Sequence, residues 1–124
     1  MDKKPLAYIV EDYRDTVTIF QGALEMAGYN VEAAYDGAVA KKRLTEIVPD
    51  LIVLDLHIPS VPGDIILRQI RGDERLKETR VFLATADANM AAQLRDDAEL
   101  VLLKPIGFSQ LKELAERFRP KEED

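Results

Sequence analysis

The chain has 124 residues, of which 47% are hydrophobic and 32% charged, and its formal net charge is −6. The absence of cysteine excludes disulfides and thiolate chemistry, no apolar run approaches the roughly 20 residues that span a bilayer, and an acidic chain lacks the basic surface that binds nucleic acid. The densest basic cluster, 41–43, has acidic neighbours and is interpreted as a solvated helix face. We therefore expect a cytoplasmic protein of one domain over residues 1–124, with a core at about 5–118 and a charged tail at 119–124.

The first predicted elements are a buried strand, an amphipathic helix and an edge strand. Residues 6–10 are all apolar, and such runs bounded by polar residues are typical of strands buried on both faces of a sheet. Residues 15–27 place apolar side chains on one helical stripe, and Gly28 suits the left-handed position after a helix. Residues 30–34 are less apolar, which predicts a strand at the edge of the sheet.

The middle of the chain continues this alternation. A helix opens at Asp36 and ends before Pro49. Residues 51–54 are a second buried strand, and 57–63 contain two prolines and a glycine, which predict a loop. A helix over about 64–71 follows, with its apolar residues on the inner face.

The last part of the chain holds two further strand and helix pairs. Residues 81–84 and 100–103 are apolar runs that predict strands, and a helix over about 89–95 lies between them. A final helix has Ser109 as its N-cap and extends to Phe118. Strand and helix thus alternate five times, which predicts an α/β fold of (βα)5 type, a doubly wound parallel sheet with helices on both faces.

Polar side chains follow four of the predicted strands where each strand ends. They are Glu11, Asp12, Asp55, Thr85 and Lys104. Ligands of open parallel sheets lie beyond the carboxyl ends of the strands, so we expect these side chains at one edge. Without a cation, two carboxylates about 4 Å apart would repel by on the order of 4 kcal/mol at an effective dielectric constant near 20. Three acids therefore favour a hard cation such as Mg²⁺ or Mn²⁺, although Glu11 and Asp12 alone would equally fit a strand end beside a helix N-terminus.

Asp55 is the best-placed nucleophile of this set, because it ends the central strand 51–54. A carboxylate can form an acyl phosphate, for which a lysine supplies a point charge and a threonine a hydrogen bond. Taken singly, Thr85 and Lys104 also fit an ordinary strand end and a surface lysine. The coincidence of all four strand ends favours phosphoryl transfer.

These residues, in this order, resemble the receiver domain of two-component response regulators, the CheY-like superfamily. The likeness covers about residues 5–118. It rests on the pair Glu11-Asp12, the segments 28–31 and 34–37, the run 49–59 around Asp55, Gly63, Thr85-Ala86 and Lys104-Pro105.

The resemblance implies a flavodoxin-like sheet of five strands in the order 2-1-3-4-5. It implies that Asp55 accepts a phosphoryl group from the phosphohistidine of a sensor histidine kinase or phosphotransfer protein. It also implies that Thr85 and Lys104 contact that phosphoryl group. The peptide bond before Pro105 is implied to be cis. The metal ligands it implies are Glu11, Asp12, Asp55 and the backbone carbonyl of His57. The His57 side chain, from the single histidine of the chain, is expected at the rim of the site and not as a phosphoryl relay. A downstream protein or effector domain would read the phosphorylated state, and we expect a monomer or weak homodimer.

Two departures from the family affect the expected output. Val101 stands three positions before Lys104, where the family usually has a Tyr or Phe that turns inward on phosphorylation. Thr85 and Lys104 are about three positions closer than usual, so roughly one helical turn of about 3.6 residues is missing near the helix 89–95. Both departures fall on the face that most receivers use for output.

Three other functions remain to be compared with this one. A phosphorylation-independent receiver-like interaction domain is favoured by Val101 and the short fourth helix, and disfavoured by the full acidic set. A haloacid dehalogenase-type phosphatase would need an acid two positions after its nucleophile, where this chain has His57, and a nucleophile on the first strand. A flavin-binding domain would place a phosphate beside Glu11 and Asp12, which would repel it. We therefore expect a phosphoacceptor domain and not an enzyme.

Overall fold

A parallel sheet of five strands in the order β2-β1-β3-β4-β5 forms the centre of the computed structural model, which describes residues 3–121. Its strands are β1 (Leu6–Val10), β2 (Asn30–Ala34), β3 (Leu51–Leu54), β4 (Arg80–Thr85) and β5 (Leu100–Leu103). The predicted strand order and α/β class are confirmed. The sequence 30–34 was expected at an edge, and β2 lies there.

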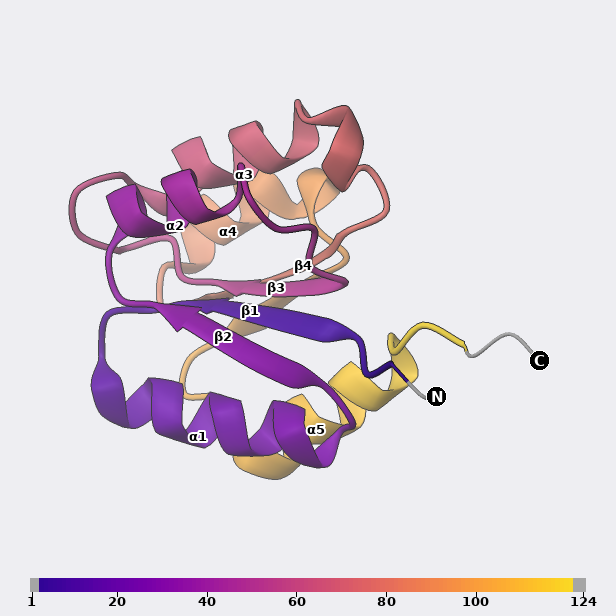
Figure 1. Ribbon diagram of the computed structural model, residues 1–124. Coiled ribbons are helices and arrows are strands. Elements are labelled where there is room, and N and C mark those ends of the chain that lie inside the picture. Colours follow the sequence, from indigo (N-terminus) through magenta and orange to yellow (C-terminus); the bar gives the residue numbers. More distant parts are fainter. Residues whose placement is uncertain (1–2, 122–124) are drawn as a thin grey trace.

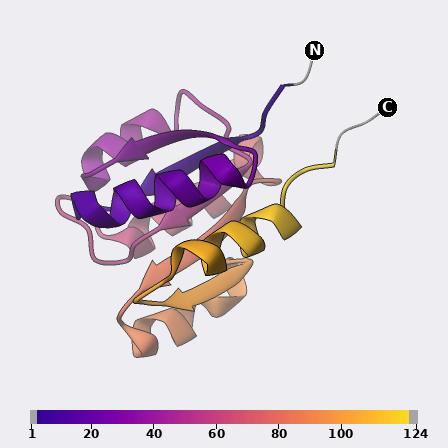
Figure 2. The same ribbon diagram turned by 90° about the horizontal axis from the view of Figure 1, so that it is seen from below.

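Helices cover both faces of this sheet (Figure 1). They are α1 (Arg14–Met26), α2 (Gly37–Arg43), α3 (Gly63–Arg71), α4 (Ala88–Leu94) and α5 (Phe108–Arg117). Helices α1 and α5 pack together on one face, as the view from below also shows, and α2, α3 and α4 lie on the other (Figure 2). Two short 3₁₀ turns, Glu74–Leu76 and Arg95–Asp97, lead into β4 and β5.

The sheet separates two apolar cores. In β1, Ala7 and Ile9 belong to the core under α1 and α5, whereas Tyr8 and Val10 belong to the core under α2 and α3. Successive side chains of a strand point to opposite faces, so a strand covered on both faces must be apolar at every position. This requirement is why the strands could be found as uninterrupted apolar runs.

Two predicted helix ends are confirmed. Gly28 has φ of +101°, the left-handed conformation that glycine adopts without strain, and it follows α1. Asp36 is the N-cap of α2, and its carboxylate accepts hydrogen bonds from the N–H groups of Ala38 and Val39.

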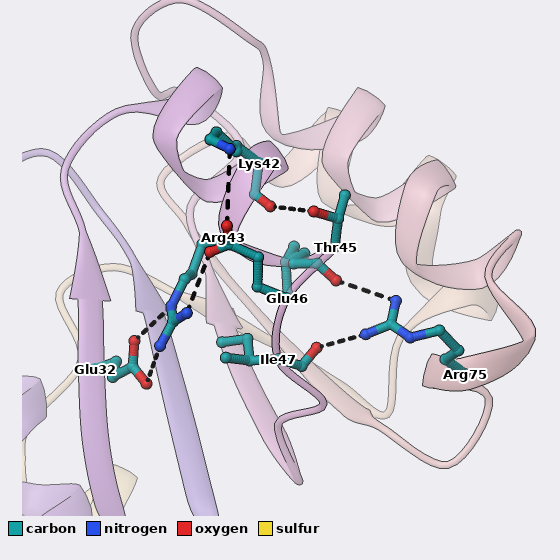
Figure 3. Close-up of polar contacts among 8 residues, drawn as sticks. Glu32, Lys42, Arg43, Thr45, Glu46, Ile47 and Arg75 are labelled. Atoms are coloured by element: carbon teal, nitrogen blue, oxygen red, sulfur yellow. Dashed lines mark hydrogen bonds and ion pairs between the residues drawn. The ribbon is translucent and has the colours of Figure 1, made fainter.

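The predicted length of the second helix is wrong. Helix α2 ends at Arg43, and residues 44–46 form turns and do not continue the helix to Pro49. Arg75, from the turn after α3, donates to the carbonyls of Leu44 at 3.4 Å and Ile47 at 3.0 Å (Figure 3). These contacts satisfy carbonyls that helix continuation would otherwise satisfy, so a distant arginine replaces local hydrogen bonds.

The basic cluster 41–43 is a solvated helix face, as predicted. Arg43 pairs with Glu32 at 3.0 Å and with Glu46 at 3.2 Å, and Lys42 lies 3.7 Å from Glu46 (Figure 3). Exposed pairs of this kind contribute roughly 0–1 kcal/mol each. Two acids, Glu32 and Glu46, therefore offset part of the positive charge of this cluster.

The start of the fourth helix agrees with its prediction, and that of the fifth does not. Asp87 is the N-cap of α4, which begins at Ala88, one residue from the predicted start at about 89. The N-cap of α5 is Gly107 and not Ser109, and the Gln110 side chain accepts a hydrogen bond from the Gly107 N–H at 3.4 Å. The N-cap of α5 therefore lies two residues before the predicted one, and the helix begins at Phe108.

Arg119, in the predicted charged tail, contacts the end of α1. The Arg119 guanidinium donates to the carbonyl of Ala27 at 3.1 Å, which ties the end of α5 to the end of α1. Residues 122–124 of that tail lie outside the described part of the chain. Over residues 3–121, no helix has the length and apolar character needed to cross a membrane.

Candidate functional site

The carboxyl ends of β1, β3, β4 and β5 meet at one edge because the strands are parallel and in register. Val10 of β1 pairs with Leu54 of β3. The Asp55 N–H donates to the Val10 carbonyl at 2.9 Å, and the Lys104 N–H donates to the Thr85 carbonyl at 2.9 Å. The backbone ladder therefore sets the positions of the polar residues that follow each strand.

Three acids converge at this edge. One carboxylate oxygen from each of Glu11, Asp12 and Asp55 lies within 4.8 Å of the other two. Glu11 and Asp55 are buried, at 1% and 6% exposure, whereas Asp12 is exposed. The predicted juxtaposition of the acids is confirmed, and an oxygen-only set of this kind suits a hard divalent cation.

Lys104 is the cation that faces these acids in the structure. Its Nζ donates to a Glu11 carboxylate oxygen and to Asp55 Oδ2, the latter at 3.0 Å. Burial raises the pKa of Glu11 above its ordinary value, against the opposing effect of the Lys104 hydrogen bond. Burial alone would lower the pKa of Lys104, but its hydrogen bonds to Glu11 and Asp55 outweigh burial and raise that pKa. One ammonium thus balances part of a three-carboxylate charge.

Backbone amides hold the remaining oxygens of the two buried acids. Glu11 Oε2 accepts from the Tyr13 N–H at 3.0 Å, and Asp55 Oδ1 accepts from the His57 N–H at 3.0 Å. Both carboxylates are therefore fixed in direction before any ligand arrives. Asp12 has greater freedom, because its side chain is exposed.

Thr85 and Pro105 lie where the sequence placed them, at the ends of β4 and β5. Thr85 is fully buried, and its Oγ1 accepts from the Asp87 N–H at 3.1 Å. A hydroxyl can accept and donate at once, so the Thr85 O–H can still donate to a ligand. The Lys104–Pro105 peptide bond is cis, as predicted.

Val101 lies on β5, three positions before Lys104, and is half-buried. It pairs with Leu83 of β4 and packs against the core under α2 and α3. Helix α4 next to it has seven residues and is followed by one 3₁₀ turn. The short fourth helix predicted from the Thr85-to-Lys104 spacing is confirmed.

A contact between His57 and Asp87 is a feature that the sequence did not reveal. His57 Nε2 lies 3.2 Å from Asp87 Oδ2, and 64% of the His57 side chain is exposed. The N–H of Met90, and then His57, lower the pKa of Asp87. Capping preference could have identified Asp87, but no pattern links it to a residue 30 positions away.

Comparison with known proteins identifies what this arrangement is similar to. The family described as "Response regulator receiver domain" matches residues 7–116. The chain is 31% identical over 110 residues to the DNA-binding dual master transcriptional regulator RpaA of Synechocystis sp., covering 86% of this chain and 46% of that protein. It therefore spans about half the length of that curated relative.

Solved structures with the same fold include two response regulators. The response regulator receiver domain (CheY-like) from Methylobacillus flagellatus superposes with a TM-score of 0.83 at 23% identity, covering 94% of this chain and 100% of that one. The phosphorylated cyanobacterial phytochrome response regulator RcpA superposes with a TM-score of 0.78 at 25% identity, covering 93% and 91% of the two chains.

Proposed function

This chain belongs to the response regulator receiver domain family, and from that premise we propose that Asp55 accepts a phosphoryl group from a phosphohistidine. The chain is a phosphoacceptor signalling domain and not a classical enzyme. The observation that carries the proposal is the convergence of the Glu11, Asp12 and Asp55 carboxylates, with the Lys104 ammonium bonded to two of them.

In the transfer step, an Asp55 carboxylate oxygen forms a bond to phosphorus while the P–N bond of the donor phosphohistidine breaks. The electron pair of that bond stays on the donor imidazole, which then takes up a proton. Asp55 is already oriented by the His57 N–H, so the nucleophile enters the reaction with little loss of freedom. Lys104 exchanges Asp55 for an oxygen of the phosphoryl group, and the Thr85 O–H donates to another.

A divalent cation, Mg²⁺ or Mn²⁺, is part of this proposal. The donor set fits such an ion, because its charged oxygens repel one another without a cation. Glu11, Asp12, Asp55 and the backbone carbonyl of His57 would hold it. The ion would supply charge neutralisation to the phosphoryl oxygens.

The partners follow from the same proposal. Receiver domains interact with histidine kinases, and we propose a sensor histidine kinase or a phosphotransfer protein in the cytoplasm as the donor. A downstream protein or effector domain would bind according to the phosphorylated state. The chain would form one receiver domain, from about residues 5–118, and act as a monomer or weak homodimer. Direct contact with nucleic acid forms no part of the proposal, given the net charge of −6.

Intact-mass spectrometry after incubation with acetyl phosphate and Mg²⁺ tests the phosphoacceptor. We expect the wild-type chain to gain one phosphoryl group and Asp55→Asn to gain none, because an amide cannot form an acyl phosphate here. Asp64→Asn, which alters an acid in the first turn of α3, should be phosphorylated like the wild type. A phosphorylated Asp55→Asn variant, or an unmodified wild type, would refute the assignment.

We expect the loop and helix between β4 and β5 to carry the response, with Val101 contributing little. Hydrogen bonds from Thr85 and Lys104 to the phosphoryl group would together stabilise the active state by roughly 3–6 kcal/mol, if each charge-assisted bond contributes roughly 1.5–3 kcal/mol. Moving an equilibrium from about 1:99 to 99:1 takes about 5.5 kcal/mol, so these two bonds can drive the switch without an aromatic side chain.

Nuclear magnetic resonance tests this mechanism. The amide chemical shifts of residues 87–100 should change when beryllofluoride is added with Mg²⁺. Unchanged shifts over 87–100 would show that this mechanism is wrong.

A second function, a phosphorylation-independent interaction domain, is favoured by Val101 and by the seven-residue α4. Lack of phosphorylation by acetyl phosphate, together with binding to a partner that is unaffected by Asp55→Asn, would support it. Phosphorylation at Asp55 would exclude it.

A further inference from the structure

The loop between β3 and α3 is fastened to the turn between β2 and α2. This loop, residues 56–62, carries the His57 carbonyl. The Gly37 N–H donates to the Pro59 carbonyl at 2.8 Å, and the Ser60 hydroxyl donates to Asp36 Oδ2. A methyl group at Gly37 would overlap the Val61 carbonyl oxygen, so this close approach requires glycine.

Ser60 adopts a conformation that needs support. Its φ is +76°, in the left-handed region that residues other than glycine and asparagine seldom occupy. Holding such a residue there costs on the order of 1–3 kcal/mol, so surrounding contacts must compensate. The hydrogen bond to Asp36 is the contact that its side chain makes.

Asp36 serves two elements at once. Its Oδ1 accepts from the N–H groups of Ala38 at 2.7 Å and Val39 at 3.1 Å, and its Oδ2 accepts from Ser60. The Ser60 hydroxyl, followed by the Val39 N–H, lowers the pKa of Asp36, which keeps the carboxylate ionised. The start of α2 and the conformation of the loop are therefore set by one side chain.

Only two residues separate Ser60 from His57, and neither is free to adjust. Ile58 is 8% exposed and belongs to the core under α2 and α3. Pro59 has its φ fixed by its ring. A change at Ser60 is therefore passed along a stiff segment to the His57 carbonyl.

We propose that Asp36, acting through Ser60, is a positioning residue that holds the β3–α3 loop in the conformation that binds the divalent cation. This inference rests on the proposed function, since it takes the His57 carbonyl as a metal ligand. It assigns a role to the N-cap residue of α2, which is neither a proposed metal ligand nor a proposed contact of the phosphoryl group.

The test separates the two tasks of Asp36. In Asp36→Ser the hydroxyl can still cap α2 but is too short to reach Ser60, and Ser60→Ala removes the other partner. Mn²⁺ affinity, measured by electron paramagnetic resonance, should fall about tenfold in each variant, the lower end of what loss of an outer-shell partner costs. The double variant should bind no more weakly than either single variant, because both changes remove one contact. Asp73→Ser is the matched control, since Asp73 caps the short turn Glu74–Leu76 and should leave Mn²⁺ affinity unchanged.

Wild-type affinity in both single variants would overturn the inference, as would losses that multiply in the double variant. Urea denaturation of each variant shows whether the protein remains folded, and Ser60→Ala remains as the test if Asp36→Ser does not fold. The outcomes also separate this inference from the proposed function. If the wild-type chain neither binds Mn²⁺ nor is phosphorylated, the proposed function and the positioning role are both refuted. If the wild-type chain binds Mn²⁺ and is phosphorylated, and the variants bind Mn²⁺ equally well, only the positioning role is refuted.

Discussion

Replacing Lys104 by methionine is expected to lower the free energy of unfolding by about 3 kcal/mol in EDTA, the lower end of the cost of breaking a buried ion pair. Methionine leaves two buried carboxylates, Glu11 and Asp55, without the ammonium that now hydrogen bonds to both. Added Mg²⁺ should restore most of the loss, since a bound cation stabilises the folded state in proportion to its affinity for it. Urea denaturation with EDTA and with Mg²⁺ measures both effects.

Lys112→Met is the control for the Lys104 variant. Lys112 lies 3.2 Å from Glu116 one turn along α5, and an i,i+4 pair on a helix surface contributes about 0.3–0.5 kcal/mol. Its loss should be small and independent of Mg²⁺. A Lys104→Met variant whose free energy of unfolding does not rise when Mg²⁺ is added would contradict a cation site at these acids.

Asp12→Asn is expected to change metal affinity and stability in opposite directions. Mg²⁺ affinity should fall by more than about 100-fold, because a charged ligand is lost. Losing a residue that only hydrogen bonds to a ligand costs up to about 100-fold. In EDTA the free energy of unfolding should rise by about 1 kcal/mol, because one of three mutually repelling acids is removed from an exposed position. Isothermal titration calorimetry and urea denaturation measure the two quantities.

Asp15→Asn makes the same charge change three positions further on, in the first turn of α1. It should leave Mg²⁺ affinity within about twofold of wild type, because water and salt screen the interaction between a surface charge outside the site and the bound ion. If Asp12→Asn and Asp15→Asn weaken Mg²⁺ binding equally, Asp12 is not a ligand.

The site could be predicted from sequence because its geometry follows from the sheet. Apolar runs such as 51–54 identify strands buried on both faces, and parallel strands bring their carboxyl ends to one edge. Any polar residue that directly follows such a run, as Asp55 and Lys104 do, must then lie near the others. The hydrogen bond between Lys104 and Asp55, at 3.0 Å, is a consequence of that order.

Contacts between loops could not be predicted in this way. The Ser60 hydroxyl meets Asp36, 24 positions away, and His57 meets Asp87, 30 positions away, and no periodicity relates either pair. The end of α2 was missed for the same reason, because Arg75 lies on another element and satisfies the carbonyls of residues 44 and 47. Local patterns give the elements and their order, whereas side chains from distant elements decide where helices end and how loops are held.

A crystal structure of the chain with Mn²⁺ and beryllofluoride tests the central claim most directly, because anomalous scattering locates the ion independently of any assumed ligand. We predict one Mn²⁺ peak held by the carboxylates of Glu11, Asp12 and Asp55 and by the His57 carbonyl. We also predict beryllofluoride on Asp55, with the Lys104 ammonium bonded to its fluorine atoms. An ion bound elsewhere, or a Lys104 that still pairs with Glu11 and Asp55 while beryllofluoride is absent from the site, would contradict a shared pocket for cation and phosphoryl group.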